Sequence, residues 1–381
     1  VMRFWLDFGV DGFRVDAIAQ VIKDDRLRSN PINPSYRVDP ASPDYDPYLA
    51  QLHVWDGMRP EVLDVVRGMR KVVDEYEGDR CLVGETAVLE RDRYAKLLGD
   101  GSSLLHLGFD FHPILASSIP EIRQAVEATS AALHPDVWPT LALSNHDQDR
   151  HVTRLTGGTV GDDVQARLAA AALLLQRGTP FIYYGEEIGL PNTVVPDDRL
   201  LDPVGLVERE RGRRLPIRPG LPAAGYGRDP ARTPMPWTDE PGGGFTAEGQ
   251  QPWLPLGDPS RNVASQSGDA VSVLSWYRRL IALRRSSAAL VAGDYEPVKA
   301  PEGVWAFLRI HGSERVLVSL AHGERSWMSI RDVGRLVGDE EARELTVLEG
   351  THRVAGSRVP AMGPIALEQG EVVVLVLRRA S

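Results

Sequence analysis

The stretch Gly12-Phe13-Arg14-Val15-Asp16-Ala17-Ile18 decides the fold of this chain. It has the composition of a short buried strand that ends in a carboxylate, and a helical pattern over residues 1–8, stopped at Gly9, precedes it. The same alternation continues for two thirds of the chain and predicts βα units with a parallel sheet. Further strands are expected at residues 81–85, 104–111, 140–144 and 181–184, and helices at 60–76, 119–133 and from the N-cap Asp162 to about 176.

The pattern along the chain predicts two domains, residues 1–292 and 293–381. Within the first, the segment from about 190 to 271 is rich in Pro, Gly and Arg. It is too long for a plain connection, so we expect a functional or partner-covering insertion, closed by an amphipathic helix that begins near Val273. In the second, strand-like runs at 304–310, 316–320, 345–348 and 371–377 are separated by Gly and Pro turns and predict a small antiparallel β domain.

Composition excludes several classes of protein. The 381 residues carry a formal net charge of −10, which argues against nucleic-acid binding, because that function needs a basic face. Cys81 is the only cysteine, so no intrachain disulfide forms and a reducing, cytoplasmic location is expected. The longest apolar run, at 168–175, is too short to cross a bilayer, so no membrane partner is expected. Composition leaves the oligomeric state open.

Three acidic residues stand at the carboxyl ends of three separate predicted strands: Asp16, Glu85 and Asp147. In a (β/α) barrel that edge is where active sites form, so we expect the three side chains to converge. Paired carboxylates suit cleavage of a glycosidic bond, with one as nucleophile and one as general acid/base. A single acid at a strand end is more often a helix cap or a surface ion-pair partner, and spacing alone leaves both interpretations open.

Four motifs in order carry a resemblance to a known family. Gly-Phe-Arg-Val-Asp (12–16), Gly-Glu-Thr (84–86) and Asn-His-Asp (145–147) resemble the strand-4, strand-5 and strand-7 motifs of the α-amylase superfamily, glycoside hydrolase family 13. The run 178–189, Gly-Thr-Pro-Phe-Ile-Tyr-Tyr-Gly-Glu-Glu-Ile-Gly, is similar to its strand-8 motif, and Arg-Thr-Pro-Met-Pro-Trp (232–237) to an insertion of its α-glucosidase and oligo-α-glucosidase branch. The resemblance therefore implies a partial (β/α)8 TIM barrel, strands 4 to 8, followed by an antiparallel β-sandwich domain.

The resemblance also implies roles for the matching positions. Asp16 would attack the anomeric carbon, Glu85 would protonate the leaving oxygen and then activate water, and Asp147 would bind the sugar in the transition state. Arg14 and His146 resemble residues that hold the sugar and orient the nucleophile, and Arg150 an arginine near the sugar pocket. A packed core histidine is the alternative for His146, and an ion pair with a neighbouring aspartate for Arg150.

The family's first three strands, the domain inserted after strand three and its calcium site have no counterpart in this chain. We therefore expect no metal or cofactor here, calcium being expected only in that missing part. We also expect the chain alone to be unstable or inactive, an expectation that hydrolysis of maltose by the 381-residue chain would contradict.

The resemblance extends to the substrate. The long insertion and the small Ala17 favour cleavage of terminal α-1,4-glucosidic bonds in small α-glucosides, maltose-like oligosaccharides or sucrose. Oligo-1,6-glucosidase action and glucosyl transfer or isomerisation, forming trehalose or sucrose isomers, stay open. A non-enzymatic barrel subunit is disfavoured, because such subunits lack the carboxylates that this chain has.

Overall fold

The computed structural model describes residues 1–42, 45–158, 162–212, 226–329, 344–360 and 364–377. Five short parallel strands lie in two hydrogen-bonded groups: β1 (Gly12–Val15), β2 (Cys81–Gly84) and β3 (Leu107–Gly108) in the order β1-β2-β3, and β4 (Thr140–Ala142) beside β5 (Thr179–Phe181). A side chain joins the two groups, because Thr140 Oγ1 donates to the carbonyl of Gly108 at 2.5 Å. The predicted parallel strands are thus present, though not as one continuous ladder.

Close approach of β1 and β2 explains the glycine that opens the deciding stretch. Gly12 pairs with Cys81, and a Cβ at residue 12 would collide with the backbone of Cys81. Any larger residue would therefore push apart the two strands that carry Asp16 and Glu85 at their ends.

Four helices lie largely where the periodicity predicts them: α1 (Met2–Phe8), α2 (Val62–Asp74), α5 (Ile119–Ala132) and α7 (Asp163–Leu174). The structure adds three further helices: α3 (Arg91–Leu98), α4 (Phe111–Leu115) and α6 (His151–Thr156). The strand predicted at 104–111 is wrong in length, because Asp110 accepts from the backbone N of His112 and starts α4. The last strand of the set lies earlier than predicted and ends at Phe181. The sequence pattern thus predicts where helices and strands occur more accurately than it predicts the residues at which they begin and end.

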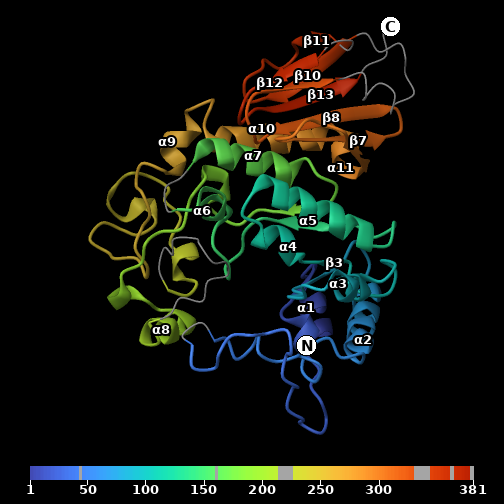
Figure 1. The fold of residues 1–381 in the computed structure, drawn as a ribbon, viewed down its shortest axis with the longest axis vertical. Helices are drawn as coiled ribbons and strands as arrows, with labels where there is room; N and C mark the ends of the chain where they lie inside the picture. The colour runs from blue at the N-terminus through green and yellow to red at the C-terminus, as the bar shows by residue number, and fades with distance from the viewer. Residues whose placement is uncertain (43–44, 159–161, 213–225, 330–343, 361–363, 378–381) are drawn as a thin grey trace.

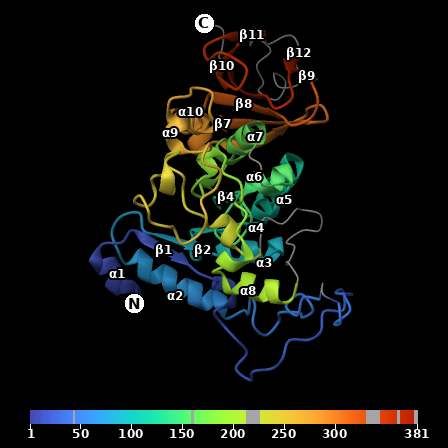
Figure 2. The same ribbon diagram turned by 90° about the vertical axis from the view of Figure 1, so that its left-hand side faces the viewer.

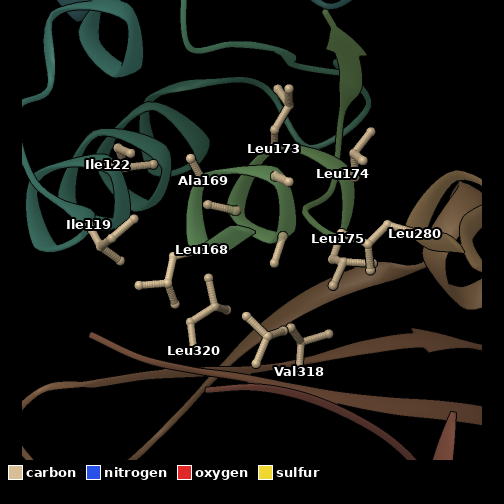
Figure 3. Packing of buried hydrophobic residues seen from close by; sticks show 14 of the residues in the cluster. Ile119, Ile122, Leu168, Ala169, Leu173, Leu174, Leu175, Leu280, Val318 and Leu320 are labelled. Carbon is tan, nitrogen blue, oxygen red and sulfur yellow. The ribbon is translucent and has the colours of Figure 1, made fainter. Parts of the chain in front are cut away.

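The largest core lies between the barrel helices and the β domain. Figure 3 shows Leu168 and Ala169 of α7 beside Ile119 and Ile122 of α5, with Leu320 of β8 (Glu314–Ala321) facing them. Helix α7 packs against α5, against α10 (Val273–Ser286) and against strand β8, so its apolar residues are buried on nearly every side. Within the described part of the chain, no helix combines the length and apolar character needed to cross a membrane.

The C-terminal β domain lies at one end of the molecule, with α1 and α2 near the other (Figure 1, Figure 2). A six-stranded antiparallel sheet packs one face on α7 and α10 and the other on a two-stranded sheet. The strands are β6 (Asp294–Val298), β7 (Val304–His311), β8, β10 (Glu344–Gly350), β11 (Arg358–Pro360) and β13 (Val372–Leu377), with β9 (Ser326–Ser329) paired to β12 (Pro364–Leu367).

The division at residue 293 stays a prediction, although β6 begins one residue later, directly after α11 (Ala288–Ala292). The predicted β domain includes residues 330–343, 361–363 and 378–381, which lie outside the described residues. The predicted insertion at 190–271 includes 213–225, which are also outside them; its described part contains α8 (Pro203–Glu210) and α9 (Val263–Ser267).

Candidate active site

A hollow of about 180 Å³ opens where the parallel strands end. Its walls come from the ends of all five strands, and Phe109 and Phe181 meet edge to face with their ring centres 4.6 Å apart. The lining residues are Arg14, Glu85, Phe109, Phe111, Ser144, Asn145, His146, Phe181, Ile182 and Tyr183. Three of the six residues predicted for the site therefore line this hollow directly.

One guanidinium joins the candidate nucleophile to the candidate acid. Arg14 Nη1 forms an ion pair with Asp16 Oδ1, and Arg14 Nη2 lies 3.1 Å from Glu85 Oε2. The backbone N of Ala17 also donates to Glu85 Oε2 at 3.0 Å. Arg14 and Asp16 are two residues apart, so their side chains point to the same side of the chain where β1 ends. The guanidinium therefore lies beside Asp16 and also reaches Glu85 at the end of the neighbouring strand β2.

Different surroundings set these two carboxylates apart. The Asp16 side chain is 77% exposed, and the hydrogen bond from Arg14 holds the pKa of its carboxyl below the usual range. The Glu85 side chain is only 13% exposed, and burial is the largest cause that raises its pKa. The neighbouring Asp16 raises it further, while the bond from Ala17 opposes the rise. One carboxyl therefore favours the ionised form and the other retains its proton to higher pH, as a nucleophile and a general acid require.

Asp147 is held on the other side of the hollow by two arginines. Its Oδ1 accepts from Arg228 Nη1 at 3.0 Å and from Arg232 Nη2 at 2.8 Å. Its Oδ2 lies 3.3 Å from His146 Nε2, and its backbone N donates to Asn145 Oδ1 at 2.9 Å. The carboxylate is thus fixed in place by cations from a segment that follows α8.

Neither arginine was among the residues predicted for the site. Arg232 opens the Arg-Thr-Pro-Met-Pro-Trp run, so the motif was a signal that could have located it, whereas no spacing pattern marks Arg228. A buried carboxylate supports Arg228 from behind: Arg228 Nη2 lies 2.7 Å from Oδ1 of Asp202, the N-cap of α8. Burial alone would raise the pKa of Asp202, but the bonds from Arg228 outweigh it and bring the pKa to about 2.

Arg14 brings two of the three candidate carboxylates together, Asp16 and Glu85, while the convergence of Asp147 with them stays a prediction. Asp16 and Asp147 do not line the hollow themselves, but each contacts a residue that does, Arg14 and His146 respectively. After the hydrogen bond from Arg14, which is the largest cause, His146 also contributes electrostatically to the lowered pKa of Asp16. The geometry agrees with a shared site, and the catalytic roles of Asp16, Glu85 and Asp147 stay predictions.

Arg150 is the predicted site residue that the structure does not bring to the hollow. Its side chain has no exposed surface and lies over the rings of Tyr183 and Tyr184, with Nη1 donating to the carbonyl of Tyr184 at 2.5 Å. Such burial is not compatible with a direct contact to a sugar. No carboxylate bonds to this guanidinium among the described residues, so the alternative of an ion pair with a neighbouring aspartate is not observed either.

Size alone does not identify the site. A larger hollow of about 390 Å³ lies between Asp46-Pro47 and α8, but none of the candidate catalytic residues lines it. Among the described residues, no group of three or more His, Cys, Asp or Glu side chains is placed to hold a metal ion.

Residues 1–293 match the family model described as the alpha amylase catalytic domain. The chain is 36% identical over 323 residues to a "Probable alpha-glucosidase" of Rhizobium meliloti, covering 83% of this chain and 55% of that protein. It is 30% identical over 358 residues to an "Oligo-1,6-glucosidase" of Parageobacillus thermoglucosidasius, covering 86% and 59%.

A solved structure is similar to this chain in fold. The crystal structure of an "alpha-glucosyl transfer enzyme, XgtA" superposes with a TM-score of 0.79 at 32% identity, covering 99% of this chain and 66% of that one. The fold is therefore that of a (β/α)8 barrel with a C-terminal β domain, and this chain spans somewhat more than half the length of these curated relatives. The chain belongs to the alpha-amylase family, among the relatives that are named as glucosidases.

Proposed function

We propose that this chain carries the catalytic carboxylates of a retaining α-glucosidase. One observation carries the proposal: a single guanidinium, Arg14, binds both Asp16 and Glu85, whose pKa values are shifted in opposite directions. A retaining glycosidase needs an ionised nucleophile and a protonated acid about 5–5.5 Å apart. A guanidinium that touches both carboxylates keeps them close enough for this geometry.

The reaction then follows from the residues. Asp16 Oδ attacks the anomeric carbon while Glu85 gives its proton to the departing glycosidic oxygen, so one C–O bond forms as the other breaks. Glu85, now ionised, takes a proton from water, and that water cleaves the glucosyl–Asp16 ester and restores both carboxyl groups. Asp147, held by Arg228 and Arg232, would accept hydrogen bonds from sugar hydroxyls as the ring flattens.

The substrates that we propose are small α-glucosides with a terminal α-1,4 bond, such as maltose-like oligosaccharides, or sucrose. The names of the relatives support α-glucosidase action, and Ala17 leaves little side-chain bulk beside the nucleophile. We further propose that β1 to β5 correspond to strands 4 to 8 of the family barrel. A cytoplasmic location and the absence of cofactor and nucleic-acid partners complete the proposal.

Covalent trapping tests this function, and labelling of the 381-residue chain would at the same time contradict the expectation that the chain alone is inactive. Incubation with 2-deoxy-2-fluoro-α-glucosyl fluoride should add one fluoroglucosyl mass, which peptide mapping should place on Asp16, because the fluorine slows release from the ester. The variant Asp16→Asn should take up no label, and the matched variant of a nearby exposed residue, Asp25→Asn, should be labelled as the unchanged chain is. Label on another carboxylate would refute the assignment.

Glucosyl transfer is a second candidate, favoured by the name of the solved relative and by the exposure of Asp16. Transfer needs an acceptor sugar or alcohol to reach the ester before water does. Product analysis on maltose, isomaltose, sucrose and trehalose separates the two, because hydrolysis releases only monosaccharides whereas transfer yields new di- or trisaccharides.

A further inference from the structure

Behind the hollow, a buried histidine closes the turn that carries Asn145, His146 and Asp147. The backbone N of His151 donates to Ser144 Oγ at 2.9 Å, and His151 Nδ1 lies 3.1 Å from the same oxygen. Ser144 lines the hollow, whereas the His151 side chain is almost wholly buried at the start of α6. The two residues thus clamp both ends of the turn.

A buried glutamate, Glu186, faces this histidine. Glu186 Oε1 lies 3.5 Å from His151 Nδ1, and both side chains are 1% exposed. Neither carboxylate oxygen of Glu186, nor His151 Nε2, has a hydrogen-bond partner among the described residues. The other groups that face Glu186 are the Arg150 guanidinium, the Glu187 carboxyl and the Tyr277 hydroxyl. Among the described residues, His151 is the basic group within 4 Å of the Glu186 carboxylate, and its imidazole can carry a proton on the nitrogen that faces Glu186.

The position of the imidazole proton decides what Ser144 can do. If Nδ1 carries no proton, its lone pair faces a carboxylate oxygen, and the Ser144 hydroxyl must donate its hydrogen to Nδ1. If Nδ1 carries the proton, that N–H can donate to Ser144 Oγ at 3.1 Å, while the Glu186 carboxylate, with Oε1 3.5 Å from Nδ1, attracts the proton without forming a hydrogen bond. Ser144 Oγ then accepts twice, from His151 N and from Nδ1–H, and its own hydrogen is left for a group in the hollow.

We propose that Glu186 fixes His151 with a proton on Nδ1 and so makes the Ser144 hydroxyl a hydrogen-bond donor to the sugar in the hollow. Glu186 and His151 are positioning residues in this scheme, and Ser144 is the substrate contact. The inference deepens the proposed function, on which its ligand rests, while the position of the proton can be measured without any substrate.

Nitrogen-15 NMR of the full chain, labelled at histidine, tests the proton directly. His151 should show a protonated Nδ1, assigned by the loss of its signals in His151→Gln. The change Glu186→Gln should shift the ring toward the form protonated on Nε2, whereas Glu187→Gln, the matched change at the neighbouring half-buried acid, should leave it unaltered. A bare Nδ1 in the unchanged chain would overturn the proposal, even if every variant failed to fold.

Binding then tests the donor. Ser144→Ala should weaken binding of 1-deoxynojirimycin, a glucose-shaped probe, by about 3- to 10-fold, the usual range for one neutral hydrogen bond. Glu186→Gln should weaken it as well, but not in a chain that already carries Ser144→Ala, because both changes remove the same bond. Additive losses would mean that Glu186 affects binding independently of Ser144, and they would refute the proposal.

The two failures can be told apart. If His151 Nδ1 is protonated but the chain neither cleaves α-glucosides nor takes up the fluoroglucosyl label, the proposed function is wrong. The inference about the proton on His151 then still holds. Cleavage by a chain whose Nδ1 is bare would support the function and refute the inference.

Discussion

The two sides of the hollow are built in different ways. On the side of β1 and β2, Arg14 lies two residues from Asp16, so the strand itself puts the cation beside the nucleophile. On the side of β4, Asp147 takes its cations from Arg228 and Arg232, which are 81 and 85 residues further along the chain. The first side therefore depends on local geometry, and the second on how a long segment folds back over the strand ends. This difference predicts how each side responds to substitution.

Removal of the nucleophile should have the largest effect. Asp16→Asn should lower the turnover of a maltose-type substrate at least about 10⁴-fold, because no covalent ester can form. Steady-state kinetics with Asp25→Asn as the control measures this. A loss below 10-fold would mean that the local side of the hollow does not supply the nucleophile.

Loss of a distant cation should come next. Arg228→Met keeps an unbranched apolar stem but removes the bonds of the guanidinium to Asp147 and Asp202, and it should lower kcat/KM by about 10²-fold through misplacement of Asp147. Arg211→Met, at the C-cap of α8, the helix whose N-cap Asp202 binds Arg228, serves as the matched control and should change little. Equal losses in both variants would show that the α8 segment matters only as a whole.

The pH profile should distinguish the two sides more finely. Arg14→Gln removes the largest cause that lowers the pKa of Asp16, so that pKa should rise. Because Asp16 must be ionised to attack, the acidic limb of kcat/KM should move to higher pH, with a several-fold loss below the new midpoint. Burial, the largest cause that raises the pKa of Glu85, stays, so the basic limb should move less. An acidic limb that stays in place would remove Arg14 from this role.

The smallest effect is expected in the backbone beside the nucleophile. Ala17 has a φ of 41°, in the left-handed region that disfavours a Cβ. Ala17→Gly should therefore raise the free energy of unfolding by about 0.5 kcal/mol, the difference between strain relief and the added chain entropy. Urea unfolding measures it, and Ala19→Gly, a buried alanine in the next turn, should instead lower the free energy of unfolding by about 1 kcal/mol.

The sequence alone determined the βα alternation, the glycine at residue 12 and the three strand ends that carry acids, because strand and helix periodicities and strand-end positions are local properties. The same locality places Arg14, two residues before Asp16, beside the candidate nucleophile.

Contacts between distant segments of the folded chain complete the site. Arg228 and Arg232 reach Asp147 across more than eighty residues, and Arg150, next to the Asn-His-Asp motif in sequence, turns away into the core beneath Tyr183 and Tyr184. No local pattern encodes either outcome, because the direction of a long arginine side chain depends on which carbonyls, rings and carboxylates the folded chain brings within its reach.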